Sequence, residues 1–200
     1  YFKKFDGPSN LTVGIVGDVK ADDVFKLAEV YFGRIPSSPK PERVRTEEPE
    51  QWGERHAIVE ALSQPIIIVG YHRPDFRHKD STALEALANI IGQGRSSKIY
   101  QVLVKEKKVA VEAGCFNGFP GEKFPNLIAF YAVSARGHNS AECLGLIDEE
   151  IEKVKKESVT PEELAKFKRS TVKNLLQQMK ANSSMAALLT GADVVLGDWK

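Results

Sequence analysis

The final third of the chain carries only helical patterning, and this feature constrains the fold most. From Asn139 onward, apolar residues recur at helical spacing in successive segments, and Asn139 with Glu142 three residues on predicts a capping pair at the first helix start. The strongest start signal is Thr160-Pro161-Glu162-Glu163, in which Thr160 can cap a helix and Glu163 can reach back to the amide of Thr160. Because no strand pattern separates these helices, the strands that precede them must pair with one another and offer one face to the helices.

The middle of the chain contains the strands that such a sheet needs. One helix is predicted from Asp80-Ser81 and a second after the turn Gly92–Ser97. Apolar and β-branched runs predict strands at 55–61, 65–72, 109–116 and 126–134. Strands followed by helices, with little strict alternation, predict an α+β fold: an antiparallel sheet with helices packed on one face.

The first residues read as the end of a different domain. Leu11–Val16 predicts a short, buried strand, and a helix follows it up to Gly33. One strand and one helix cannot bury their own faces, so this pair needs partners before Tyr1. We therefore predict three parts: residues 1–36 as the last strand and helix of an upstream domain, a Pro-rich and charged linker at 37–54, and a second domain at 55–200 that lacks its final strand.

Composition excludes several classes of partner. The 28 Lys and Arg residues nearly cancel the 27 Asp and Glu residues, so no net field attracts nucleic acid or an anionic membrane. The longest apolar run, Leu127–Val133, is far shorter than the roughly 20 residues that span a bilayer. Cys115 and Cys143 are too few for a disulfide framework and lack metal-ligand spacing, so both are interpreted as small buried residues.

No side-chain pattern in the chain predicts catalysis or metal binding. The four histidines are His56, His72, His78 and His138. None of them pairs with a second histidine at the i, i+4 spacing, with an adjacent Glu, that would place two zinc ligands on one helix face. His72 and His78 could form a metal pair, but polar residues at a strand exit are the favoured interpretation. The glutamates are likewise interpreted as solvated charge rather than paired catalytic acids, and the candidates weighed are Glu106, Glu112, Glu149 and Glu150.

A glycine-containing turn, Gly92-Gln93-Gly94-Arg95-Ser96-Ser97, invites comparison with a phosphate-binding loop because a helix begins directly after it. It follows a helix rather than a strand, and it lacks the Gly-Lys-Ser/Thr ending of nucleotide loops. Gly94, Arg95, Ser96 and Ser97 are therefore predicted to be a structural turn and a Ser-capped helix start.

Four segments together resemble one known family, the insulinase or pitrilysin-type zinc metallopeptidases. Tyr1–Pro36 resembles the last strand and helix of the family's first domain, and Gln64–Pro74 resembles the opening strand of its second domain. Gly94–Leu103 is similar to the family's best-known non-catalytic stretch, and Val159–Leu164 to the start of its late helix. Their order and spacing agree, and Gly197–Lys200 is similar to bacterial members.

The resemblance implies a zinc metalloendopeptidase whose paired half-shells enclose peptides or unfolded proteins in a chamber. The family holds zinc through an inverted His-x-x-Glu-His motif and a later Glu, all upstream of Tyr1, so we expect zinc in the full-length parent and neither metal ligands nor catalytic residues in this chain. The metal would polarise the scissile carbonyl and the motif Glu would act as general base. The resemblance also favours a location in the bacterial periplasm, and this expectation rests on related proteins rather than on residues of this chain.

One family feature is missing within the chain itself. Many members carry an Arg and a Tyr that hold substrate, and the pattern places Val104 and Val111 at those positions. Neither valine can donate a hydrogen bond. Arg95 and Tyr100 lie nearby, but they are five residues apart, whereas the Arg and Tyr of the family are seven residues apart. They are therefore interpreted as structural. We therefore expect a second half-shell or partner subunit to supply this function, in a dimer.

Two alternatives remain open. The chain could belong to a catalytically inactive scaffold half-shell of the same family. It could also be a peptide-binding module that adds a peptide strand to the edge of its sheet.

Overall fold

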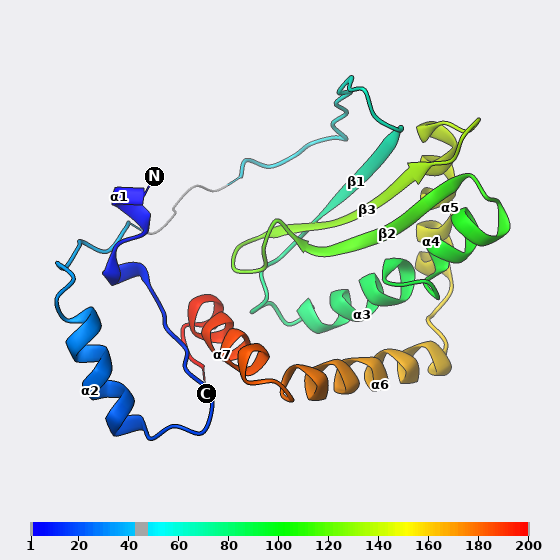
Figure 1. Cartoon of the computed structure of the whole chain (residues 1–200). Coiled ribbons are helices and arrows are strands. Elements are labelled where there is room, and N and C mark those ends of the chain that lie inside the picture. The colour runs from blue at the N-terminus through cyan, green and yellow to red at the C-terminus, as the bar shows by residue number, and fades with distance from the viewer. Residues whose placement is uncertain (1, 43–47, 200) are drawn as a thin grey trace. The chain divides into compact units, whose positions relative to one another are not determined.

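The computed structural model describes residues 2–42 and 48–199 (Figure 1). Contacts divide the chain into two compact units, Ala61–Leu175 on the one hand and Tyr1–Glu60 with Leu176–Lys200 on the other. Residues 43–47, which fall within the predicted linker, lie outside the described residues.

The unit Ala61–Leu175 is built on a three-stranded antiparallel sheet in the order β1-β3-β2. The strands are β1 (Ile66–Arg73), β2 (Ala110–Phe119) and β3 (Asn126–Ser134). The register pairs Ala113 with Ala132 and Cys115 with Phe130, so these side chains share one face of the sheet. The predicted α+β fold with an antiparallel sheet is confirmed, and β3 has the predicted bounds.

Helices cover this face of the sheet. They are α3 (Ser81–Gly92), α4 (Lys98–Tyr100), the π-helical turn η2 (Gln101–Glu106), and α5 (Ser140–Lys156). Their apolar residues meet the strands in one core, whose fully buried members include Ile99, Leu103, Cys143 and Ile147. Because residues at i, i+3 and i+4 share a helix face, the helical spacing in the sequence correctly predicts that Ile99 and Leu103 turn inward.

The opposite face of the sheet remains open. Ile66, Ile68 and Phe116 are 52%, 63% and 48% exposed, although all three belong to paired strands. Tyr131 of β3 stacks on Phe116, with 4.8 Å between ring centroids and 19° between planes. The sheet therefore has one face packed into the core and one apolar face that meets solvent.

A buried arginine ties the ends of several elements together. Arg73, at the end of β1, is 4% exposed, and its guanidinium donates to the side chains of Ser81 at 2.9 Å and Asn117 at 2.5 Å. These bonds connect the start of α3 and the end of β2 to β1. Glu122, 3.8 Å from the Arg73 Nη1, provides the nearest carboxylate. We assign this cluster a structural role because each contact joins one element to another.

Two helix starts in this part of the chain match the sequence prediction. The Asn139 side chain accepts from the amide of Glu142 at 3.0 Å at the start of α5. Thr160 and Glu163 form a reciprocal pair before α6 (Pro161–Gln178), with amide-to-side-chain distances of 2.9 Å and 3.2 Å. This is the capping box that the Thr-Pro-Glu-Glu motif predicts.

The other unit contains α1 (Phe2–Phe5), the 3-10 turn η1 (Pro8–Asn10), α2 (Ala21–Phe32) and α7 (Asn182–Leu196). Leu11–Val16 has no ladder partner among the described residues, and Leu11 and Val13 are each 60% exposed. The prediction of a strand here placed its partners before Tyr1, so it stays a prediction. The segment contacts α7, since Thr12 donates to Asp193 at 3.0 Å. Without a neighbouring strand edge, an extended run of β-branched residues cannot form a sheet.

A second predicted strand, at 55–61, is also absent from the described structure. Ile58 and Val59 are 93% and 86% exposed, and this stretch carries no strand pairing. Its short run of apolar and β-branched residues expresses a preference for extended backbone, which becomes a strand only when an edge is available to pair with. In the described residues no helix is long and apolar enough to cross a membrane.

Candidate functional site

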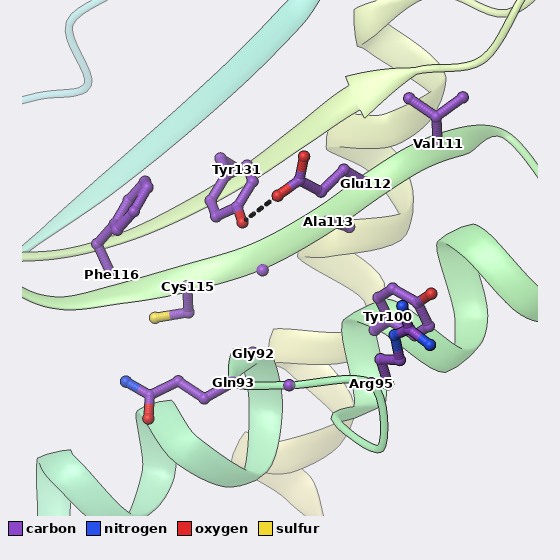
Figure 2. Close-up of a pocket in the computed structure, with 12 residues that line it drawn as sticks. Gly92, Gln93, Arg95, Tyr100, Val111, Glu112, Ala113, Cys115, Phe116 and Tyr131 are labelled. Atoms are coloured by element: carbon purple, nitrogen blue, oxygen red, sulfur yellow. Dashed lines mark hydrogen bonds between the residues drawn. The ribbon is translucent and has the colours of Figure 1, made fainter.

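A cleft of about 500 Å³ lies between β2 and the turn that joins α3 to α4 (Figure 2). Polar groups from separate elements converge on it. The turn contributes Gly92, Gln93, Gly94 and Arg95, helix α4 contributes Tyr100, β3 contributes Tyr131, and β2 contributes Val111, Glu112, Ala113, Gly114, Cys115 and Phe116. A second hollow, of about 630 Å³, runs along α7 and is lined mainly by small and apolar residues, so it offers few groups for specific recognition.

The turn that forms one wall is held by its own backbone. Gly94 has a φ of +80°, a conformation that favours glycine, and its carbonyl accepts from both the amide and the hydroxyl of Ser97 at 3.1 Å and 2.8 Å. The Gln101 side-chain amide donates to the carbonyl of Arg95. Ser97 is 2% exposed and precedes α4, but its hydroxyl bonds Gly94 and makes no side-chain cap to the helix. The expected Ser-capped helix start is wrong in that detail.

Close packing joins this wall to the strand. A Cβ atom added to Gly92 would lie 2.2 Å from the Cβ of Cys115, so only glycine lets α3 approach β2 this closely. This contact sets the spacing between the turn and the strand.

The floor of the cleft is the edge strand β2. On it, Glu112 accepts a hydrogen bond from the Tyr131 hydroxyl at 3.0 Å. Burial, and after it the bond to Glu112, raise the pKa of Tyr131 above its ordinary value. Burial also raises the pKa of Cys115 to about 12. The Cys115 thiol is therefore protonated at neutral pH, and a protonated thiol is not a nucleophile.

The two positions at which the family resemblance predicts an Arg and a Tyr, Val104 and Val111, do not both reach this cleft. Val111 is 54% exposed and lines it. Val104 lies in the π-helical turn, is half-buried, and packs against the core. Arg95 and Tyr100, interpreted from the sequence as structural, both line the cleft.

The other candidates from the sequence have ordinary surroundings. His78 and His138 lie 3.6 Å and 2.7 Å from carboxylate oxygens of Asp80 and Glu142. Throughout residues 2–42 and 48–199, no three His, Cys, Asp or Glu side chains gather closely enough to hold a metal ion. Cys115 and Cys143 are both free and buried, as predicted. Glu150, predicted to be solvated, is only 5% exposed because α5 turns it toward the packed side, where Lys153 donates to it.

Sequence reasoning singled out several residues that line the cleft but did not predict that they come together in one site. Tyr131, Glu112 and Phe116 come together only because β2 and β3 pair in a particular register. Alternation along residues 112–116 could indicate which side chains share a face, but no local pattern indicates which residues of β3 lie opposite. The assembled groups can donate and accept hydrogen bonds and offer no activated nucleophile, so the cleft is suited to binding.

An antiparallel sheet covered by helices on one face, with a cleft beside its edge strand, defines an α+β domain. A family model described as the Peptidase M16 inactive domain matches residues 1–171, and the chain belongs to this peptidase family. The resemblance to insulinase or pitrilysin-type peptidases is thereby confirmed.

Individual relatives agree. The chain is 30% identical over 189 residues to the zinc protease PqqE of Helicobacter pylori, which covers 90% of this chain and 41% of that protein. A solved protease structure from Helicobacter pylori superposes with a TM-score of 0.82 and 28% identity, over 92% of this chain and 44% of that one. The periplasmic protease PqqL of Escherichia coli has a TM-score of 0.64 and 18% identity, over 92% of this chain and 20% of that one, and shows the fold alone. The chain thus spans less than half the length of these relatives.

Proposed function

We propose that this chain is the non-catalytic second-domain part of a zinc metalloendopeptidase and forms part of the wall of a peptide-enclosing chamber. The observation that carries the proposal is the open sheet face, where Ile66, Ile68 and Phe116 remain exposed and Phe116 also lines the cleft at β2. Exposed apolar surface of this kind, rimmed by polar groups, is typical of interaction sites. Membership of the M16 family supplies the enzymatic context.

In this proposal, zinc is held by the full-length parent outside this chain. The described residues contain no group that fits a metal, so no step of the reaction is assigned to them. Residues 1–36 would complete the upstream, zinc-bearing domain, 37–54 would link the domains, and 55–200 would form the second domain. The fragment alone would then be inactive.

A partner supplies what Val104 and Val111 cannot. Neither side chain carries a hydrogen-bond donor, and Val104 packs against the core. A second half-shell or partner subunit would therefore provide the Arg and Tyr that contact substrate, in a dimeric enzyme. A bacterial periplasmic location, which the family resemblance implies, completes the proposal.

The test uses the full-length protein with its partner. The gene is first read upstream for His-x-x-Glu-His, then zinc is measured by mass spectrometry and cleavage of an unstructured peptide is followed. We expect the motif, bound zinc and cleavage. An upstream region without the motif would favour the inactive scaffold half-shell. Cleavage by a zinc-free preparation would contradict the proposal.

A second candidate function, a peptide-binding module, is favoured by the position of β2. Within the described residues β2 pairs only with β3, so its other edge can accept an extended peptide. A zinc-loaded, full-length protein that binds peptides but never cleaves them would support this candidate over the peptidase.

A further inference from the structure

Two donor groups without partners stand at one end of the cleft. Arg95 is exposed in the turn between α3 and α4, and Tyr100 is half-buried at the end of α4. Across the described chain, neither the Arg95 guanidinium nor the Tyr100 hydroxyl has a hydrogen-bond or salt-bridge partner. Figure 2 shows both side chains at the end of the cleft nearest Val111, while Gln93 and Phe116 lie toward the other end.

The backbone beneath Arg95 is fixed although its side chain is not. Ser97 bonds the carbonyl of Gly94 twice, and Gln101 bonds the carbonyl of Arg95. The turn therefore fixes the backbone from which the Arg95 side chain extends beside the cleft. A guanidinium presents a fork of N–H donors that matches a carboxylate.

Strand β2, the floor of the cleft, offers a peptide its backbone contacts. Gly92 packs directly on Cys115, so the turn closes that part of β2. At the other end of the strand, Val111 and Glu112 are exposed. This accessible end of β2 is the one near which Arg95 stands (Figure 2). An extended peptide paired with β2 would thus pass close to the guanidinium.

The charge at this end of the cleft comes from one cation and one anion. Arg95 and Glu112 are the charged residues of the cleft lining. The Glu112 carboxylate already accepts from Tyr131 at 3.0 Å, and no salt bridge within the described structure joins it to Arg95. An incoming carboxylate would therefore find Arg95 free to bind it.

We propose that Arg95 and Tyr100 are specificity-determining residues that bind a carboxylate of an extended peptide lying along β2. The proposal rests on the peptide-binding role proposed above and narrows its substrate class to peptides with a carboxylate at this point. The group is either an Asp or Glu side chain or the C-terminus of the peptide, since both present the same two oxygens.

The test measures peptide affinity by fluorescence anisotropy in the full-length protein with its partner. Three labelled peptides share one neutral, unstructured sequence: one amidated, one amidated with a single Glu inserted, and one with a free C-terminus. We expect one of the two acidic peptides to bind about tenfold more tightly than the neutral peptide, and which one does so identifies the source of the carboxylate.

Variants then assign the effect. Arg95→Gln should abolish the roughly tenfold preference for the acidic peptide over the neutral one, Arg95→Lys should restore part of this preference, and Tyr100→Phe should reduce it a few-fold. Arg136→Gln, an exposed arginine outside the cleft, is the matched control and should change nothing.

Three results would overturn the assignment. Equal affinity for the neutral and the acidic peptides would refute the carboxylate site at Arg95 and Tyr100 and leave the proposed peptide-binding function intact. An equal loss for all three peptides in Arg95→Gln would show that Arg95 is structural. Failure of every peptide to bind would remove the proposed peptide-binding function itself, and the carboxylate site with it.

Discussion

The two faces of the three-stranded sheet have similar apolar side chains and opposite surroundings. On one face, helices α3, α4 and α5 bury the strands, and Ile147 and Leu103 are completely enclosed. On the other face, Ile66 and Ile68 remain more than half exposed. Apolar character in a strand therefore does not by itself indicate which face stabilises the fold. The covered face stabilises the domain, and the open face is available for contacts with other molecules.

The largest difference between the faces should come from matched Ile→Ala substitutions. Ile147→Ala removes a fully buried side chain and should lower the free energy of unfolding by about 3 kcal/mol, because it loses transfer free energy and leaves a cavity. Ile68→Ala, on the open face, is the control. Denaturant unfolding of the 200-residue chain measures both. Equal losses for the two variants would contradict the assignment of the two faces.

The covered face should also respond to alkaline pH through Cys115. Its pKa is about 12 in the folded chain against 9.0 for the ordinary thiol, so the unfolded chain loses this proton first. The stability that Cys115 contributes is complete below about pH 9 and declines as the pH rises toward 12, by about 1.4 kcal/mol at pH 10.

Cys115→Ala isolates this effect from other groups that titrate at high pH. The difference between variant and wild-type stability, followed by denaturant unfolding from pH 8 to 10, should shrink as the wild type loses the Cys115 contribution. A constant difference over that range would show that the thiol is not shielded on the covered face.

A smaller effect is expected where α6 begins beside the covered face. Thr160→Ala removes one half of the capping box with Glu163 and should cost about 1 kcal/mol in unfolding experiments. Lys98 of α4 also binds Glu163 at 2.9 Å, which links the cap to the helix layer. Thr82→Ala, an exposed threonine inside α3, is the matched control and should be nearly neutral. A neutral Thr160→Ala would mean that the cap is not needed.

The smallest effect on stability is expected on the open face. Ile68→Ala should change the free energy of unfolding by less than about 0.5 kcal/mol, because the side chain is 63% exposed. In the full-length protein, however, it should weaken peptide binding measured by anisotropy, since the proposed chamber wall includes this face. Unchanged peptide affinity would separate the open face from the proposed function.

Local signals predicted the elements whose stabilising contacts are local. Asn139 with Glu142, and Thr160 with Glu163, form the predicted helix starts because a cap needs only residues three positions apart. The strand predicted at 55–61 failed because a strand also requires a partner edge, which local sequence does not reveal. For the same reason the cleft was only partly foreseen: Arg95 was singled out, whereas Tyr131 reaches the cleft through cross-strand register.

The contact between Gly92 and Cys115 has a mechanical consequence. Because the helix backbone presses directly on the strand, the wall and the floor of the cleft form one rigid piece, with no side chain between them to yield. A peptide that binds along β2 would meet a surface that is already shaped. Little conformational entropy of the protein would then be lost on binding, and the binding free energy would be more favourable. Any larger residue at position 92 would push the turn away from β2 and widen the cleft, even though it would touch no ligand.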